Sequence, residues 1–211
     1  MAANSVPGIS VAVVQDGELV WSQSFGMADL ENSVPATSAT LFRLGSISKP
    51  ITATAILQLS ERGKLDLDAE VQKYCPAFPK KEWPITTREL LGRLSGIRHY
   101  HPDGKGDIPE DSAKHFANME ESLQIFAADA LVAKPGTKFH YSTYGYALGW
   151  GTQKKYGLAL VEHTGGQQGT STSIILVPER RAGIAVLANM ERVDSAVLST
   201  DILKIALDLK D

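Results

Sequence analysis

An α+β domain with an antiparallel sheet built from both chain ends is the fold class that the sequence predicts. A hairpin pattern opens the chain, helical patterns fill its middle, and strand patterns followed by one helix close it. Strands kept apart from helices, rather than alternating with them, are typical of this class. We expect one domain over 1–211, with the sheet from about 6–27 and 149–190, a helical part at about 46–148 and a final helix at 195–209.

The first pair of strands is indicated by a strong turn. Residues 8–15 are β-branched and apolar, Asp16-Gly17 is a hairpin turn, and the strand pattern resumes over 18–25. Residues 28–40 show no clear period, and we expect a connecting loop there.

The first helix of the helical part is predicted after Pro50. Apolar residues recur at helical spacing from Ala53 to Leu59, and Gly63 is a good residue to follow the helix end. The patterns that follow predict a short helical piece at 68–74, a helix at 88–94 capped by Thr86-Thr87 and stopped by Ser95-Gly96, a long surface loop at 97–118, a helix at 119–132 and a turn at Pro135-Gly136.

The last third is rich in strand patterns. Strands are predicted over 156–162, 170–177 and 183–188, with turns at Gly165-Gly166 and at 178–181. The final helix, 195–209, carries an apolar stripe that should pack flat on the sheet, formed by Leu198, Ile202, Ala206 and Leu209.

Composition excludes several classes of function. The chain has 211 residues, 43% hydrophobic and 21% charged, with a net charge of −3, which describes an ordinary globular domain. No basic cluster indicates nucleic-acid binding, and no apolar run is long enough to span a membrane. A single cysteine, Cys75, excludes an internal disulfide and a cysteine-based metal site. The first residues lack a signal-peptide pattern, so we expect a soluble chain of open localisation.

Ser46 and Lys49 form the chemically most informative pair. Pro50 confines both residues to the first turn of the following helix, where side chains three positions apart share a face. A lysine there opposes the helix dipole, which favours the neutral amine, and a neutral amine beside a hydroxyl is a base beside a nucleophile. The spacing alone is common, with about one match expected by chance in such a chain. Ser46 or Ser48 as a helix cap, with a solvated Lys49, is the alternative.

Further short motifs follow in a set order. They are FRLGSISK at 42–49, GKLDLD at 63–68, LSGIRHY at 94–100, YST at 141–143 and HTGG at 163–166. With these motifs the chain resembles the serine β-lactamase and penicillin-binding-protein superfamily, on its class C and esterase side. Within it, the chain is most similar to the mitochondrial serine β-lactamase-like branch and its bacterial relatives. The resemblance spans residues 6 to about 209.

The resemblance implies a role for each motif residue. Ser46 would be the acylated nucleophile, Lys49 its base, and Tyr141 the proton shuttle to the leaving group. The backbone N–H groups of Ser46 and Gly166 would form the oxyanion hole. For Tyr141 the alternative is a structural tyrosine with its ring in the core.

Two motif residues depart from the β-lactamase pattern. Thr143 stands where many class C relatives have Asn, and His163 stands where β-lactamases usually carry Lys. The resemblance makes both of them substrate-binding residues, together with Thr164 and Gly165. Because an imidazole is not permanently charged at neutral pH, His163 would hold a substrate carboxylate weakly and in a pH-dependent way. A surface histidine at a strand end is the alternative.

A metal site is the competing chemistry. His99 and His101 could ligate a metal if both rings shared a strand face, with His115 or an acid completing the set. The stretch has the pattern of a loop rich in solvated groups, so we expect neither a metal nor a cofactor.

The chain also departs from the superfamily in length. Only 22 positions separate Tyr141 from His163, a gap that is much longer in the superfamily and supplies much of its helical subdomain. Sheet surface that is normally covered would then be exposed, which predicts homo-oligomer formation or marginal stability. The first functional hypothesis is a serine hydrolase that cleaves amide or ester bonds of a small-molecule or peptide substrate through an acyl-enzyme on Ser46, with a peptide or other amide ranked above a β-lactam. The second is a non-catalytic, self-assembling protein on the same scaffold.

Overall fold

Two compact units make up the chain in the computed structural model, which describes residues 6–98, 115–138 and 145–210. The sheet unit comprises residues 1–52 and 144–211, and the middle unit comprises residues 53–143. We describe each unit by itself. Helix α1 (Ser48–Glu61) starts in the sheet unit and ends in the middle unit.

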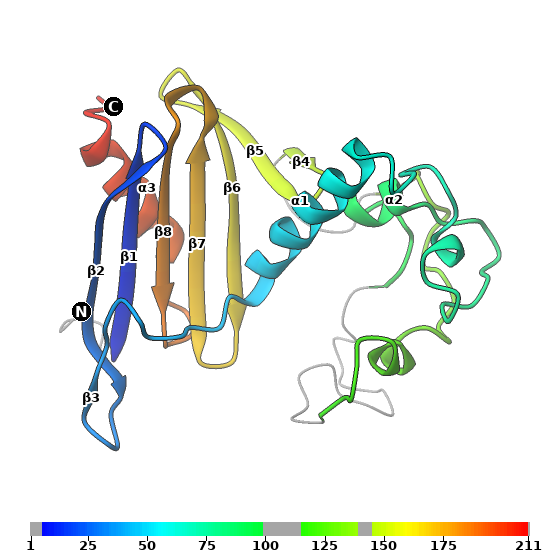
Figure 1. The fold of residues 1–211 in the computed structure, drawn as a ribbon, viewed down its shortest axis with the longest axis horizontal. Coiled ribbons are helices and arrows are strands. Elements are labelled where there is room, and N and C mark those ends of the chain that lie inside the picture. Colours follow the sequence, from blue (N-terminus) through cyan, green and yellow to red (C-terminus); the bar gives the residue numbers. More distant parts are fainter. Residues whose placement is uncertain (1–5, 99–114, 139–144, 211) are drawn as a thin grey trace. The chain divides into compact units, whose positions relative to one another are not determined.

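The sheet contains eight strands in the order β3-β2-β1-β8-β7-β6-β5-β4, with every neighbouring pair antiparallel (Figure 1). Strand β1 pairs with both β2 and β8, so the two chain ends share one sheet and the predicted α+β class is confirmed. The strands are β1 (Gly8–Gln15), β2 (Glu18–Asp29), β3 (Val34–Pro35), β4 (Gly145–Ala147), β5 (Trp150–Lys155), β6 (Leu158–Gln167), β7 (Thr170–Val177) and β8 (Ala182–Ala188).

Helix α3 (Ser195–Ala206) covers one face of this sheet (Figure 1). Alternate residues of the central strands point at the helix, as the two-residue period of a strand requires, and they form the main core with the fully buried Leu203. The stripe predicted for this helix is partly wrong, because Leu198 remains 39% exposed. The buried residues of α3 are Ser195, Ser199 and Leu203, each one position after or before a residue of the predicted stripe or its continuation. Small hydroxyl residues there let the helix approach the sheet closely.

The strand predictions were confirmed in outline and wrong in detail. The expected loop at 28–40 contains the short strand β3, and β5 was not predicted. Gly165-Gly166 is not a turn: both residues lie inside β6, opposite Thr172 and Ser171. The chain reverses instead at residues 168–169, where Gly169 has a φ of +72°. A glycine pair in a strand leaves room for a neighbouring backbone, which a local turn signal cannot reveal.

The middle unit holds short helices around a small core of Phe78, Ile85 and Ala127. Helix α2 begins with the predicted cap: Thr86 Oγ1 accepts from the Glu89 N–H, and the Glu89 carboxylate accepts from the Thr86 N–H. The helical elements beyond α1 are α2 (Thr87–Leu91) and the 3₁₀ turns η3 (Val71–Lys73) and η4 (Glu121–Ile125). The sheet unit adds η2 (Gly45–Ile47) and η5 (Pro178–Arg180).

The helix predicted at 119–132 was wrong, since only η4 forms there. Side chains bind backbone carbonyls that a helix would need for its own ladder. Lys81 Nζ donates to the carbonyls of Ala127 and Asp129, and the Arg98 guanidinium donates to Ile125 O. The helix is therefore replaced by turns that these distant cations stabilise.

Candidate active site

Ser46 and Lys49 lie together, as their spacing predicted. Ser46 is in the 3₁₀ turn η2, Lys49 is in the first turn of α1, and Lys49 Nζ lies 2.9 Å from Ser46 Oγ. Both residues are partly exposed. A basic group within hydrogen-bonding distance of a hydroxyl, accessible to solvent, is the arrangement that nucleophilic catalysis by serine needs.

Two glycines let the Ser46 backbone lie against strand β6. Gly45 has a φ of +54°, and a Cβ on it would lie 2.9 Å from Gly166 N. A Cβ on Gly165 would lie 2.1 Å from Leu44 O and 3.1 Å from Ser46 N. Larger side chains would therefore push the two backbones apart. The backbone of the predicted site residue Ser46 thus lies beside that of Gly165 and Gly166. The close approach is possible because glycine occupies each point of contact.

Strand β7 contributes two residues that our sequence analysis missed. Thr172 Oγ1 donates to Leu44 O at 2.9 Å and lies 3.2 Å from Gly165 O. Thr170 Oγ1 lies 3.1 Å from Arg43 O and 3.0 Å from Ala188 O. The run of four hydroxyl residues that begins β7 was the available signal, because buried hydroxyls in a strand need partners.

The edge of β6 beside Ser46 is open among the described residues. Strand β5 pairs with β6 only as far as Glu162, and residues 164–167 have one strand neighbour, β7, among the described residues. Thr164 and Gly166 are exposed on this segment. Unpaired backbone groups at a sheet edge bind an extended chain or a single carbonyl group.

His163 is buried rather than lying on the surface, with only 7% of its area exposed. Its Nδ1 donates to the carbonyl of Thr164 at 2.6 Å, because a carbonyl oxygen can only accept. The alternative of a surface histidine is therefore wrong. The hydrogen bond fixes the ring orientation and assigns the proton to Nδ1.

Several predicted residues lie outside the described part of the chain. Tyr141 and Thr143 are among them, as are His99 and His101. His115 is described and exposed. Within 6–98, 115–138 and 145–210, no three His, Cys, Asp or Glu side chains gather as metal ligands. No helix in these ranges is long and apolar enough to cross a membrane.

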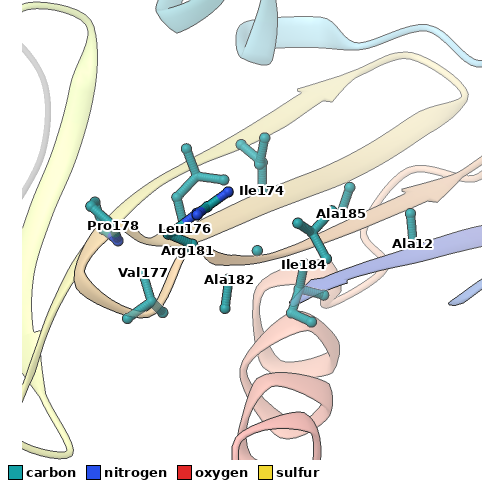
Figure 2. Close-up of a pocket in the computed structure, with 11 residues that line it drawn as sticks. Ala12, Ile174, Leu176, Val177, Pro178, Arg181, Ala182, Ile184 and Ala185 are labelled. Carbon is teal, nitrogen blue, oxygen red and sulfur yellow. The ribbon is translucent and has the colours of Figure 1, made fainter. Parts of the chain in front are cut away.

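A pocket lies in the sheet unit, and neither Ser46 nor Lys49 is among the residues that line it. Figure 2 shows this pocket, of about 380 Å³, with Ile174, Leu176 and Ala12 among its apolar lining. Among the described residues that line it, Arg181 is the one with a charge. The described lining residues include no hydroxyl, imidazole or carboxylate side chain.

The fold and the Ser46–Lys49 pair define a protein of the serine β-lactamase type, and comparison with known sequences agrees. The sequence model of the Beta-lactamase family matches residues 1–149. The chain therefore belongs to the β-lactamase family. It is 36% identical over 211 residues to the mitochondrial serine beta-lactamase-like protein LACTB of Bos taurus, covering 67% of this chain and 38% of that protein. It is also 32% identical over 172 residues to the esterase EstB of Burkholderia gladioli, covering 76% and 41%.

The chain thus spans about two fifths of the length of these curated relatives.

Solved structures share its fold at low identity. The octameric penicillin-binding protein homologue from Pyrococcus abyssi superposes with a TM-score of 0.79 at 20% identity, covering 100% of this chain and 75% of that one. The D-amino acid amidase from Ochrobactrum anthropi SV3 gives 0.73 at 16%, covering 98% and 96%. A class C beta-lactamase gives 0.69 at 18%, covering 97% and 92%.

Proposed function

We propose that this chain is a serine hydrolase that cleaves an amide or ester bond through an acyl-enzyme on Ser46. The observation that carries the proposal is the 2.9 Å separation of Lys49 Nζ and Ser46 Oγ. The heavy-atom distance suits a hydrogen bond in either direction, so a neutral amine can accept the hydroxyl proton. The names of two relatives, an esterase and an amidase, support this class of bond.

The proposed reaction has two halves. In the first, Lys49 takes the Ser46 proton while Oγ attacks the substrate carbonyl carbon and negative charge moves to the carbonyl oxygen. The backbone N–H groups of Ser46 and Gly166 would stabilise that charge. The tetrahedral adduct then expels the amine or alcohol, which receives a proton through Tyr141. In the second, water attacks the ester on Ser46, releasing the carboxylic acid and restoring the serine hydroxyl.

The substrate we favour is a peptide or another amide, in preference to a β-lactam. The open edge of β6 at residues 164–167 suits an extended chain, and Thr143 and His163 replace the Asn and Lys of the β-lactamase pattern. If the His163 imidazolium orients a carboxylate, KM for an acidic substrate should fall as the pH is lowered, whereas KM for its neutral amide should not. An equal pH dependence for both substrates would assign His163 a structural role only.

A serine-directed acylating probe tests the proposal directly. We expect a single adduct by intact mass, mapped to Ser46 by peptide analysis. Ser46→Ala should abolish it, and Lys49→Ala should slow labelling by at least about 100-fold, since a serine without a base is a poor nucleophile. Ser48→Ala is the matched control, because Ser48 is exposed two positions away and should label like the wild type. An adduct on Ser48 or Ser95, or normal labelling of Lys49→Ala, would refute the assignment.

Self-association is a second proposal, carried by strand β2. Five large apolar side chains of this strand are between 37% and 63% exposed, namely Leu19, Val20, Trp21, Phe25 and Met27. Among them, the rings of Trp21 and Phe25 lie together, with their centroids 6.4 Å apart. A second copy of the chain would cover this exposed apolar surface. We expect sedimentation velocity to show an oligomer that Trp21→Ser with Phe25→Ser dissociates. Leu41→Ser, which removes an isolated exposed leucine, should leave the oligomer intact.

A further inference from the structure

We infer that Thr170 and Thr172 are positioning residues for the nucleophile, a role that rests on the hydrolase function proposed above. Their hydroxyls hold the backbone of the segment just before Ser46 on the sheet. Thr170 Oγ1 lies 3.1 Å from Arg43 O, and Thr172 Oγ1 lies 2.9 Å from Leu44 O. Successive carbonyls of one segment are thus bound by alternate residues of one strand, whose side chains share a face.

Each hydroxyl has one proton and two carbonyl partners. One partner belongs to the segment before Ser46, and the other belongs to the sheet: Gly165 O for Thr172 and Ala188 O for Thr170. The Thr172 hydroxyl therefore links the segment before Ser46 to β6, and the Thr170 hydroxyl links it to β8. Leu44 O also accepts from the Ile47 N–H at 3.2 Å, so the carbonyl that Thr172 binds closes the turn containing Ser46.

Burial makes these links hard to replace. Thr172 is fully buried and Thr170 nearly so, which leaves no room for water to take over a lost hydrogen bond. Gly165 provides the space, because a Cβ there would lie 2.3 Å from Thr172 Oγ1. The same glycine thus permits both the approach of the Ser46 backbone and the hydroxyl contact. A nucleophile displaced by about 1 Å can lose about 100-fold in rate, so this link bears on reactivity.

The opposite face of β7 supplies a matched control. Ser173 follows Thr172 directly, is equally buried, and its Oγ lies 2.8 Å from Ser199 Oγ in helix α3. Ser199 also donates to Ala196 O, so it keeps a partner when the Ser173 hydroxyl is removed. Ser173→Ala therefore removes a buried hydroxyl from the same strand without touching the segment before Ser46.

The experiment compares Thr172→Val, Thr172→Ser and Ser173→Ala with the wild type, using the acylating probe and amide hydrogen exchange. We expect Thr172→Val to lower the maximal labelling rate by about 10- to 100-fold, with the half-saturating probe concentration little changed. Thr172→Ser should restore most of the rate because it restores the hydroxyl, and Ser173→Ala should label like the wild type. Exchange of the Ile47 amide should be faster in Thr172→Val alone.

Each other outcome has a distinct meaning. Labelling of Thr172→Val at the wild-type rate would overturn the inference and leave the hydrolase function standing. Equal slowing in Thr172→Val and Ser173→Ala would also overturn it, because general packing would then explain both. If the wild type takes no label on Ser46, the hydrolase function fails, and hydrogen exchange alone decides: unchanged exchange at Ile47 in a folded Thr172→Val would refute the positioning role.

Discussion

The sheet unit and the middle unit are stabilised in different ways. In the sheet unit, strands from both chain ends and helix α3 enclose one continuous apolar core. Among the described residues of the middle unit, Phe78, Ile85 and Ala127 form a small buried cluster, and side chains also bind backbone groups there. The Ser46–Lys49 pair lies in the first unit. The difference teaches that the candidate catalytic pair is attached to the part of the chain with the larger core.

The largest effect on stability should come from the core of the sheet unit. Leu203→Ala removes a fully buried side chain at the α3–sheet contact, and we expect the free energy of unfolding to fall by about 2–5 kcal/mol. Urea unfolding followed by circular dichroism measures this. The control is Ile205→Ala on the same helix, since Ile205 is 82% exposed and its loss should change stability little. Equal losses for both variants would contradict the packing of α3 described here.

A smaller loss is expected for a cation of the middle unit. The Arg98 guanidinium pairs with the Asp129 carboxylate and donates to Ile125 O, with its side chain only 12% exposed. Arg98→Met should lower stability by about 1–3 kcal/mol, because a carboxylate and a carbonyl lose their donor. Proteolysis within 119–132 should also become faster. Unchanged proteolysis there would show that this ion pair does not organise the segment.

The cap of α2 should contribute less again. Thr86→Ala removes the hydroxyl that accepts from the Glu89 N–H, and we expect a loss of about 1 kcal/mol in denaturant unfolding. Thr86→Ser keeps an acceptor oxygen at the same position and should recover most of that stability. If serine and alanine behaved alike, the capping hydrogen bond would not be the cause.

The smallest effect should come from the exposed Asp68–Arg88 pair. The hydrogen bond from Arg88 lowers the pKa of the Asp68 carboxyl below its ordinary value. A lowered pKa stabilises the fold above the pKa of the unfolded chain, and that contribution is lost as the pH falls through the folded value. Wild type and Arg88→Gln should therefore differ slightly at neutral pH and low salt and converge in acid. Both side chains are about half exposed or more, so added salt should also remove the difference.

Local sequence determined much of this protein. The β1–β2 hairpin follows from Asp16-Gly17, the end of α1 from Gly63, and the start of α2 from Thr86, because each depends on backbone preferences within a few residues. The closeness of Ser46 and Lys49 was predictable for the same reason, since a three-residue spacing in a helical turn is a local constraint.

Tertiary structure alone decided the features that join distant residues. Position 165 of strand β6 requires glycine because the backbone of Leu44 and Ser46, more than a hundred residues earlier in the chain, occupies the space a side chain would need. The predicted helix at 119–132 is reduced to the 3₁₀ turn at 121–125, where Arg98 binds the carbonyl of Ile125 and Lys81 binds those of Ala127 and Asp129. The hydroxyls of Thr170 and Thr172 bind the carbonyls of Arg43 and Leu44, which lie more than a hundred residues earlier in the chain. Local patterns cannot show these outcomes, because a buried polar group binds whichever partner the fold brings to it.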